Sequence, residues 1–104
     1  MTDLNRVGGS FTITADDGHV AGRTDFRDRG DERVFFHTEI DDAYGGQGLA
    51  GTLVRAALSE TAAEEKSIVA VCPFVRGWLE KHPGEFSWRR PTPEDIDWIK
   101  DQLS

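Results

Sequence analysis

The sequence predicts one α/β domain in which three antiparallel strands and a parallel fourth form a sheet, with helices packed on it. Three observations support this fold class. Apolar and polar residues alternate over three segments between residues 10 and 41, a glycine-rich stretch then leads into an amphipathic helix pattern, and a short apolar run follows that helix. A chain of 104 residues is long enough to bury the core of one such domain.

The three alternating segments cover residues 10–15, 20–27 and 33–41. Asp17-Gly18 between the first two is a strong hairpin signal, and a turn-rich stretch at residues 28–31 separates the second from the third. The three segments are therefore expected to form an antiparallel sheet. Alternation along the third assigns its residues to two faces: Val34, Phe36, Thr38 and Ile40 to one, and Phe35, His37 and Glu39 to the other.

Helical spacing of apolar residues runs from Leu49 to about Lys66, and the unbroken apolar run at residues 68–72 is typical of a strand buried on both faces. A strand, a helix and a second strand of this kind form a parallel pair with a right-handed crossover. The fourth strand is therefore expected beside the third.

Two further helices are expected after this strand. Pro73 suits the first turn of one, which ends at Lys81 or earlier, and Thr92-Pro93 reads as the N-cap and first position of another. This organisation divides the chain into an N-terminal extension, residues 1–9, a domain, residues 10–86, and a C-terminal tail with a short helix, residues 87–104.

Composition limits the classes of partner. Acidic residues outnumber basic ones 19 to 12, the net charge is −7, and no basic cluster exceeds two residues, so neither nucleic acid nor a membrane is an expected partner. A cationic substrate is easier to accommodate. No apolar segment approaches the roughly 20 residues of a membrane span, and a single cysteine forms no internal disulfide. We expect a cytoplasmic protein that is a monomer or a weak dimer.

The stretch YGGQGLAG, residues 44–51, joins a strand pattern directly to a helix pattern. Glycines at such a junction let the backbone approach a ligand closely, and the first N–H groups of a helix have no partner within it. These donors favour an anion such as a phosphate or pyrophosphate. The stretch lacks the Lys-Ser/Thr of a P-loop, so spacing alone leaves a phosphate cradle and a plain tight turn open.

Three segments together carry a resemblance to a known family: FFHTEI at residues 35–40, YGGQGLAGTLV at residues 44–54, and VCPFVRGWLEKHPGEF at residues 71–86. With the order of elements, they resemble the GNAT acetyltransferase superfamily and, within it, the minimal single-domain N-acetyltransferases of the YjdJ type. The resemblance implies transfer of an acetyl group from acetyl-CoA to an amine on a protein lysine, an N-terminus or a small molecule. The alternatives are a non-catalytic CoA- or acyl-CoA-binding module and an interaction protein that uses its acidic face.

In that superfamily the loop carries a Gln or Arg, two spacers, a Gly, one spacer and a Gly or Ala, and its amides hold the pyrophosphate of acetyl-CoA. Gly48 and Ala50 match the last two positions, whereas Gly45 stands where the Gln or Arg is expected. Arg89 and Arg90 are further candidates for phosphate contacts, with a solvated surface as the alternative. No residue is assigned to a metal. The resemblance implies cofactor contacts from Ile40, Tyr44, Gly45, Gly46, Gln47, Gly48, Leu49, Ala50, Cys72, Phe74 and Val75.

Cys72 and His37 are the candidate catalytic residues. A thiol at the start of a helix lies near unpaired N–H groups that favour the thiolate, although a buried cysteine can also be an inert core residue. The resemblance implies that a cysteine at this strand end pairs with a histidine of the preceding strand, here His37, which can act as a base near neutral pH. Larger members often use a tyrosine after the later strand as the acid. Tyr44, the only tyrosine, precedes the loop, so Cys72 or a water is expected to replace it.

Overall fold

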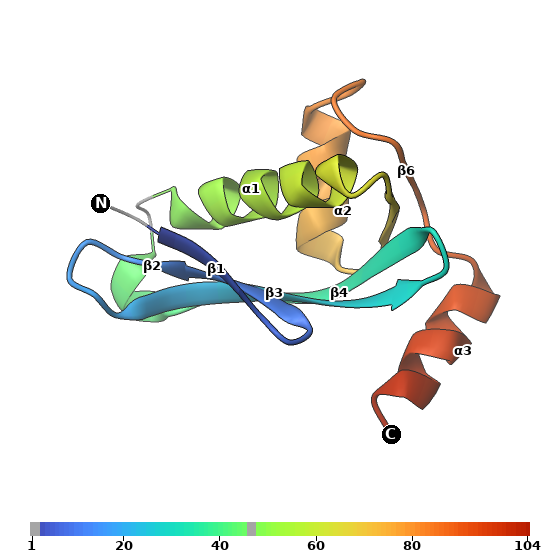
Figure 1. Cartoon of the computed structure of the whole chain (residues 1–104), viewed down its shortest axis with the longest axis horizontal. Helices are drawn as coiled ribbons and strands as arrows, with labels where there is room; N and C mark the ends of the chain where they lie inside the picture. Colours follow the sequence, from blue (N-terminus) through green and yellow to red (C-terminus); the bar gives the residue numbers. More distant parts are fainter. Residues whose placement is uncertain (1–2, 46–47) are drawn as a thin grey trace.

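A computed structural model describes residues 3–45 and 48–104 of the chain. Its strands are β1 (Asp3–Val7), β2 (Ser10–Thr14), β3 (Val20–Arg29), β4 (Glu32–Ile40), β5 (Ser67–Ala70) and β6 (Trp88–Arg89). Its helices are the short 3-10 helix η1 (Asp42–Tyr44), α1 (Leu49–Ala63), α2 (Pro73–Lys81) and α3 (Pro93–Gln102). Within the described ranges the strands form one sheet in chain order, antiparallel from β1 to β4 and parallel from β4 to β6 (Figure 1).

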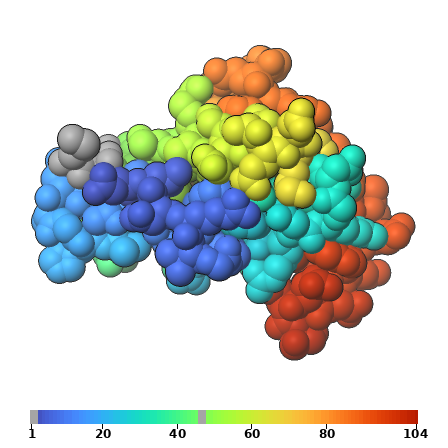
Figure 2. Space-filling model, viewed as in Figure 1, coloured from blue at the N-terminus to red at the C-terminus, as the bar shows by residue number. Residues whose placement is uncertain are grey.

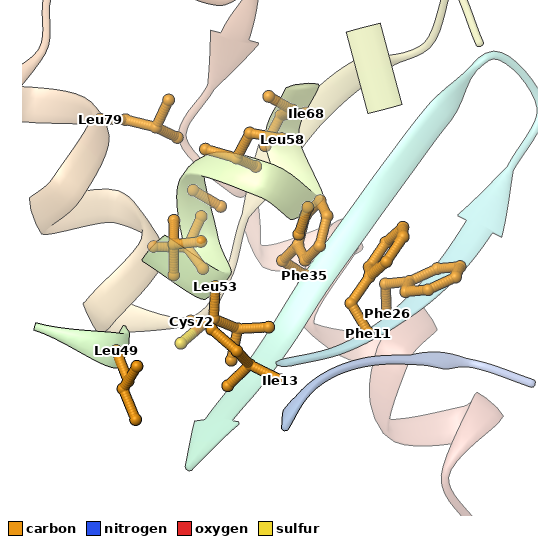
Figure 3. Packing of buried hydrophobic residues seen from close by; sticks show 14 of the residues in the cluster. Phe11, Ile13, Phe26, Phe35, Leu49, Leu53, Leu58, Ile68, Cys72 and Leu79 are labelled. Carbon is orange, nitrogen blue, oxygen red and sulfur yellow. The ribbon is translucent and has the colours of Figure 1, made fainter. Parts of the chain in front are cut away.

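Helices cover the two faces of the sheet unequally. The apolar stripe of α1 and two residues of α2 pack on one face against the side chains of Phe11, Phe26 and Phe35, whose rings contact one another (Figure 3). On the other face, α3 places Ile99 against Val34 and Val69. Figure 2 shows α3 projecting from one corner of the molecule and the exposed strand β1 along its front. In the part of the chain that the structure describes, no helix therefore covers the antiparallel end of the second face.

The predicted fold class is confirmed, because the three antiparallel strands, the parallel β5 and the helices all form. The Thr92 prediction is also confirmed: its side chain accepts from the backbone N–H of Asp95, and the Asp95 side chain accepts from that of Thr92. The sheet is larger than expected. Its first strand, β1, lies in the predicted N-terminal extension and pairs with β2, and its last strand, β6, lies in the predicted C-terminal tail.

The prediction that Val34, Phe36, Thr38 and Ile40 share one face of the sheet is wrong. Asp25 pairs with His37 while Phe26 pairs with Phe35, so Phe36 is an extra residue in β4. Such a bulge interrupts the alternation of side chains along a strand. Val34 and Phe36 consequently lie on the α3 side, whereas Ile40 packs against the core on the α1 side. His37 follows Phe36 on the face that α1 does not cover.

A buried arginine anchors the first half of β4. The side chain of Arg33 has no exposed surface and donates to both Asp28 and Glu64, with its guanidinium 4.6 Å from the ring centre of Phe26. Hydrogen bonding from Arg33 lowers the pKa of Glu64. The two carboxylates come from β3 and from the residue after α1, so the cluster joins the sheet to the helix above it.

A second charged cluster holds α3 in place. Arg89 of β6 donates to Glu32 and to Asp95, and Asp95 is almost fully buried. Hydrogen bonding from Arg89 holds the pKa of Asp95 well below its usual range. None of the helices in the described part of the chain has the length and apolar content that a membrane crossing requires.

Candidate functional site

The strands β4 and β5 part just after the bulge. Their last pair is Phe35 with Ala70, after which the backbone N–H groups of Val71 and Cys72 both donate to the carbonyl oxygen of Phe35. β5 ends there, while β4 continues to Ile40. The second half of β4 therefore pairs with β3 alone and leaves an opening on the side where α2 begins.

This opening holds a cavity of about 290 Å³, called the β4 cavity below. Small residues of the glycine-rich stretch, two side chains of β4 and the ring of Phe74 form its walls, which are mainly apolar. The lining residues are Thr38, Ile40, Tyr44, Gly45, Gly48, Leu49, Ala50 and Phe74. All of these except Thr38 are among the residues predicted to contact a cofactor.

The remaining predicted contacts lie elsewhere. Cys72 and Val75 are buried in the α1-side core, at the base of α2. Gly46 and Gln47 lie outside the described residues.

The start of α1 is open to a ligand. Gly48 is its N-cap and has the left-handed backbone conformation, with φ of 73°, which glycine adopts at little cost. Among the described residues no side-chain hydrogen bond caps the helix, and its first turn carries no acidic residue. The first backbone hydrogen bond of the helix runs from Thr52 to Gly48, so the N–H groups before Thr52 have no acceptor within α1. Together with the helix dipole, they provide donors for an anion.

Cys72 forms the N-cap of α2 and is only 3% exposed. Its thiol donates to the hydroxyl of Thr38 at 3.3 Å, and that hydroxyl lies 3.0 Å from the hydroxyl of Thr24. In Figure 3 its sulfur lies among the core side chains labelled there. Thr38 is thus the side chain that connects Cys72 to the β4 cavity. The sequence did not single it out, because uninterrupted alternation placed Thr38 on the same face as Val34 and Phe36, which pack on the α3 side.

His37 lies on the face that α1 leaves uncovered, and its side chain is 49% exposed. Its Nε2 atom is 4.0 Å from a carboxylate oxygen of Glu39, which also pairs with Arg23 at 3.2 Å. The contacts of the described residues do not bring His37 and Cys72 together, since Cys72 faces the α1-side core. The histidine is instead open to solvent on the other face of the sheet.

Tyr44 donates its hydroxyl to Asp17 in the β2–β3 turn at 2.6 Å. Hydrogen bonding to this carboxylate raises the pKa of Tyr44 to about 12. The phenol therefore holds its proton more tightly than an ordinary tyrosine does. Its ring still forms part of the wall of the β4 cavity.

The two arginines of the tail are engaged in ion pairs. Arg89 belongs to the cluster that holds α3, and Arg90 pairs with Glu80 of α2. A different arginine, Arg55 of α1, lies beside the glycine-rich end of the helix, in a groove next to the β4 cavity. The only sequence signal for Arg55 is its place seven residues after Gly48, about two helical turns along α1.

Comparisons with known proteins agree with this geometry. The chain is similar to the solution structure of a GCN5-like protein from Staphylococcus aureus, with a TM-score of 0.67, 22% identity, and coverage of 88% of this chain and 91% of that one. It is also similar to the crystal structure of the ribosomal-protein-S18-alanine N-acetyltransferase from Escherichia coli, with a TM-score of 0.60 and 19% identity. That match covers 70% of this chain and 50% of the Escherichia coli enzyme.

No curated protein sequence matches the chain significantly. Nothing in the comparisons distinguishes the YjdJ-type branch, which stays a prediction. The sequence profile of the GCN5-related N-acetyl-transferase family, in contrast, matches residues 10–88, which include the strands β2 to β5 and the first residue of β6. The chain therefore belongs to the GCN5-related N-acetyltransferase family and is an acetyltransferase.

Proposed function

We propose that the protein transfers an acetyl group from acetyl-CoA to an amine, and that the cofactor lies in the β4 cavity and against the start of α1. One observation carries the proposal: the uncapped N-terminus of α1 borders a cavity at the point where β4 and β5 part. An apolar cavity beside unpaired backbone donors fits a ligand with an apolar arm and a pyrophosphate.

The residues of the site fit this cofactor. Gly48 has no side chain to block the helix start, and the absence of acids in the first turn avoids repulsion of a pyrophosphate. Bound acetyl-CoA would supply an activated acetyl thioester. Backbone N–H groups at the free edge of β4 are our candidates for polarising its carbonyl, as in an oxyanion site.

His37 is the proposed general base. An alkylammonium group with a pKa near 10.4 is neutral in only about one molecule in 2,500 at pH 7, at a cost of about 4.6 kcal/mol, so a lysine-like acceptor needs a proton acceptor. The exposed ring of His37 can take this proton from an amine that approaches the face not covered by α1.

Cys72 is the proposed proton donor to the leaving thiolate, a role that water can also fill. A covalent route through an acetylated Cys72 is the competing mechanism. We favour direct attack by the amine, because one site that holds amine and thioester together gains little from a second acyl transfer. The nearly complete burial of the thiol and its hydrogen bond to Thr38 are consistent with this choice.

The cofactor assignment is tested by calorimetric titration with acetyl-CoA. Gly48→Val should weaken binding by about tenfold or more, because a β-branched side chain then stands at the helix start. Gly30→Val is the matched control, since Gly30 also has a positive φ, 62°, and open space around it, but lies in the β3–β4 turn. Equal affinities of the two folded variants for acetyl-CoA would contradict the placement of the cofactor at the start of α1. Gly45→Arg should tighten binding if the side-chain contact of the superfamily can be restored.

The alternative is a module that binds CoA without turnover. Two observations favour it: Gly45 stands where the superfamily carries a Gln or Arg, and the sheet separates His37 from Cys72. Incubation with labelled acetyl-CoA and a panel of amines separates the two functions. Label on an amine supports transfer, whereas tight binding with no labelled product from any acceptor supports the module.

A further inference from the structure

A hollow of about 410 Å³, called the Arg27 hollow below, lies on the α3 side of the sheet, the same side as His37. The strand β3 contributes three charged side chains to its lining, those of Arg23, Asp25 and Arg27. The bulged residue of β4, Phe36, and the residue that ends α3, Leu103, also line it. The hollow therefore lies beside the point where the bulge turns β4 toward its open half.

Arg27 is held in place without an ion pair. Its Nη1 atom donates to the carbonyl oxygen of Phe26 at 3.0 Å, and its guanidinium carbon lies 5.5 Å from the ring centre of Phe36. A Cβ atom at Gly9 would lie 2.5 Å from the same nitrogen, so glycine leaves room for the guanidinium here. No carboxylate among the described residues pairs with Arg27. A guanidinium has several N–H donors, and one carbonyl leaves the others open to an anion.

The acidic side chains nearby gather at the other end of the hollow. Asp25 accepts from the hydroxyl of Ser10 at 2.5 Å and from Nε of Arg23 at 3.2 Å. Arg23 also pairs with Glu39 at 3.2 Å. Both acids are therefore held by Arg23, and Arg27 keeps a positive charge of its own in a chain whose net charge is −7. A guanidinium in this state binds a carboxylate well, through two parallel N–H donors.

The proposed base lies at the acidic end. His37 pairs with Asp25 across the strands, and the side chains of such a pair begin about 5 Å apart. Glu39 is 4.0 Å from Nε2 of His37. Arg27 follows Asp25 by two residues, which is about 7 Å along β3. An ammonium group that arrives at His37 thus meets negative charge, and a group a few bonds away from it meets the positive charge of Arg27.

We propose that the acceptor is an amine that also carries a carboxylate, and that Arg27 binds this carboxylate while the amine lies at His37. The inference rests on the proposed function, because it needs an acceptor on this face of the sheet. The transfer itself is unchanged: the bond between the amine nitrogen and the acetyl carbon forms, the bond from that carbon to sulfur breaks, and the amine proton goes to His37. Arg27 selects the acceptor, which is an amino acid or a peptide with an acidic side chain beside the reacting amine.

Steady-state acetylation of two matched pairs of acceptors tests the proposal. Lysine against lysinamide reports a free carboxylate, and a peptide with Lys next to Asp against the same peptide with Asn reports an acidic side chain. In at least one pair the parent should show a kcat/KM about tenfold or more higher for the carboxylate member. Equal values in both pairs would overturn the inference alone, whereas transfer to none of the acceptors would overturn the proposed function and the inference with it.

Variants of Arg27 test whether this side chain causes the preference. Arg27→Gln should abolish it and Arg27→Glu should reverse it, and comparison with the parent cancels any difference in basicity between the amines. Arg76→Gln is the matched control, because Arg76 of α2 also has no ion pair among the described residues and lies outside the hollow. It should leave the preference unchanged. A full preference in Arg27→Gln, with the parent's midpoint of thermal unfolding, would overturn the role of Arg27.

Discussion

The two halves of β4, before and after Phe36, have opposite environments. From Glu32 to Phe35 the strand pairs with β3 on one side and β5 on the other, and Arg33, Val34 and Phe35 are at most 1% exposed. After Phe36, β3 is the only strand among the described residues that pairs with β4, and the side chains of His37 and Glu39 are about half exposed. One inserted residue thus separates a segment that holds the fold together from a segment open to ligands. Substitutions in the first half should therefore lower the stability of the fold, and substitutions in the second half should lower the activity.

The largest effect is expected in the first half. Arg33→Ala should lower the free energy of unfolding by about 3 to 5 kcal/mol, because Asp28 and Glu64 lose the buried cation between them. Urea unfolding followed by circular dichroism measures the change. Arg23→Ala is the control, since this arginine is 48% exposed and its ion pairs should contribute about 1 kcal/mol or less. Similar losses of unfolding free energy in the two variants would contradict the claim that the first half of β4 holds the fold together.

In the second half, His37→Ala should leave stability within about 0.5 kcal/mol of the parent protein. It should nevertheless lower kcat/KM for a lysine-like acceptor by about 100-fold, the usual scale for a positioned general base. His19→Ala provides a matched control, because His19 lies in the β2–β3 turn with its side chain 78% exposed. Full activity of the His37 variant would leave the base of this enzyme unidentified.

Cys72 lies where the two halves meet, and its replacement distinguishes the two mechanisms. With direct attack, Cys72→Ser should keep much of the activity, and intact mass spectra of the parent without an amine should show no added acetyl group. Loss of all transfer in the variant, together with an acetylated parent protein, would favour the covalent route instead.

The smallest effect concerns Tyr44, which follows the open end of β4. As the only tyrosine, it can be titrated by ultraviolet absorbance, and its midpoint should lie at about 12 rather than at the ordinary 10. Because the pKa is raised on folding, the stabilisation from the bond to Asp17 is fully present below pH 10 and is lost as pH rises toward 12. Asp17→Asn should return the midpoint toward 10. An unchanged midpoint in that variant would show that another group holds the proton.

Elements defined by neighbouring residues could be predicted from the sequence. The Asp17-Gly18 turn and the Thr92 cap depend on chemistry within a few residues, and the start of α1 follows from its glycines. The strand β1 was missed because all its residues are exposed and no apolar pattern marks it, although Gly8-Gly9 before β2 is itself a hairpin signal.

Features that depend on distant partners could not be predicted. The bulge at Phe36 exists only relative to the register of β3, so the alternation of β4 by itself misplaced Thr38. Most of the lining of the β4 cavity followed from the resemblance and the glycine-rich stretch. The place of Arg55 in the neighbouring groove did not, since Arg55 and Trp78 meet only when α1 and α2 pack.

Arg33 also determines the register in which β4 can pair with its neighbouring strands. A slip of β4 by one residue would turn every side chain to the opposite face of the sheet. Arg33 would then face Val69 and Ile99 beneath α3 and lose its bonds to Asp28 and Glu64. An unpaired charge in such a place is strongly unfavourable. The same side chain that joins sheet and helix in the native protein thus disfavours the nearest misaligned pairing of β4.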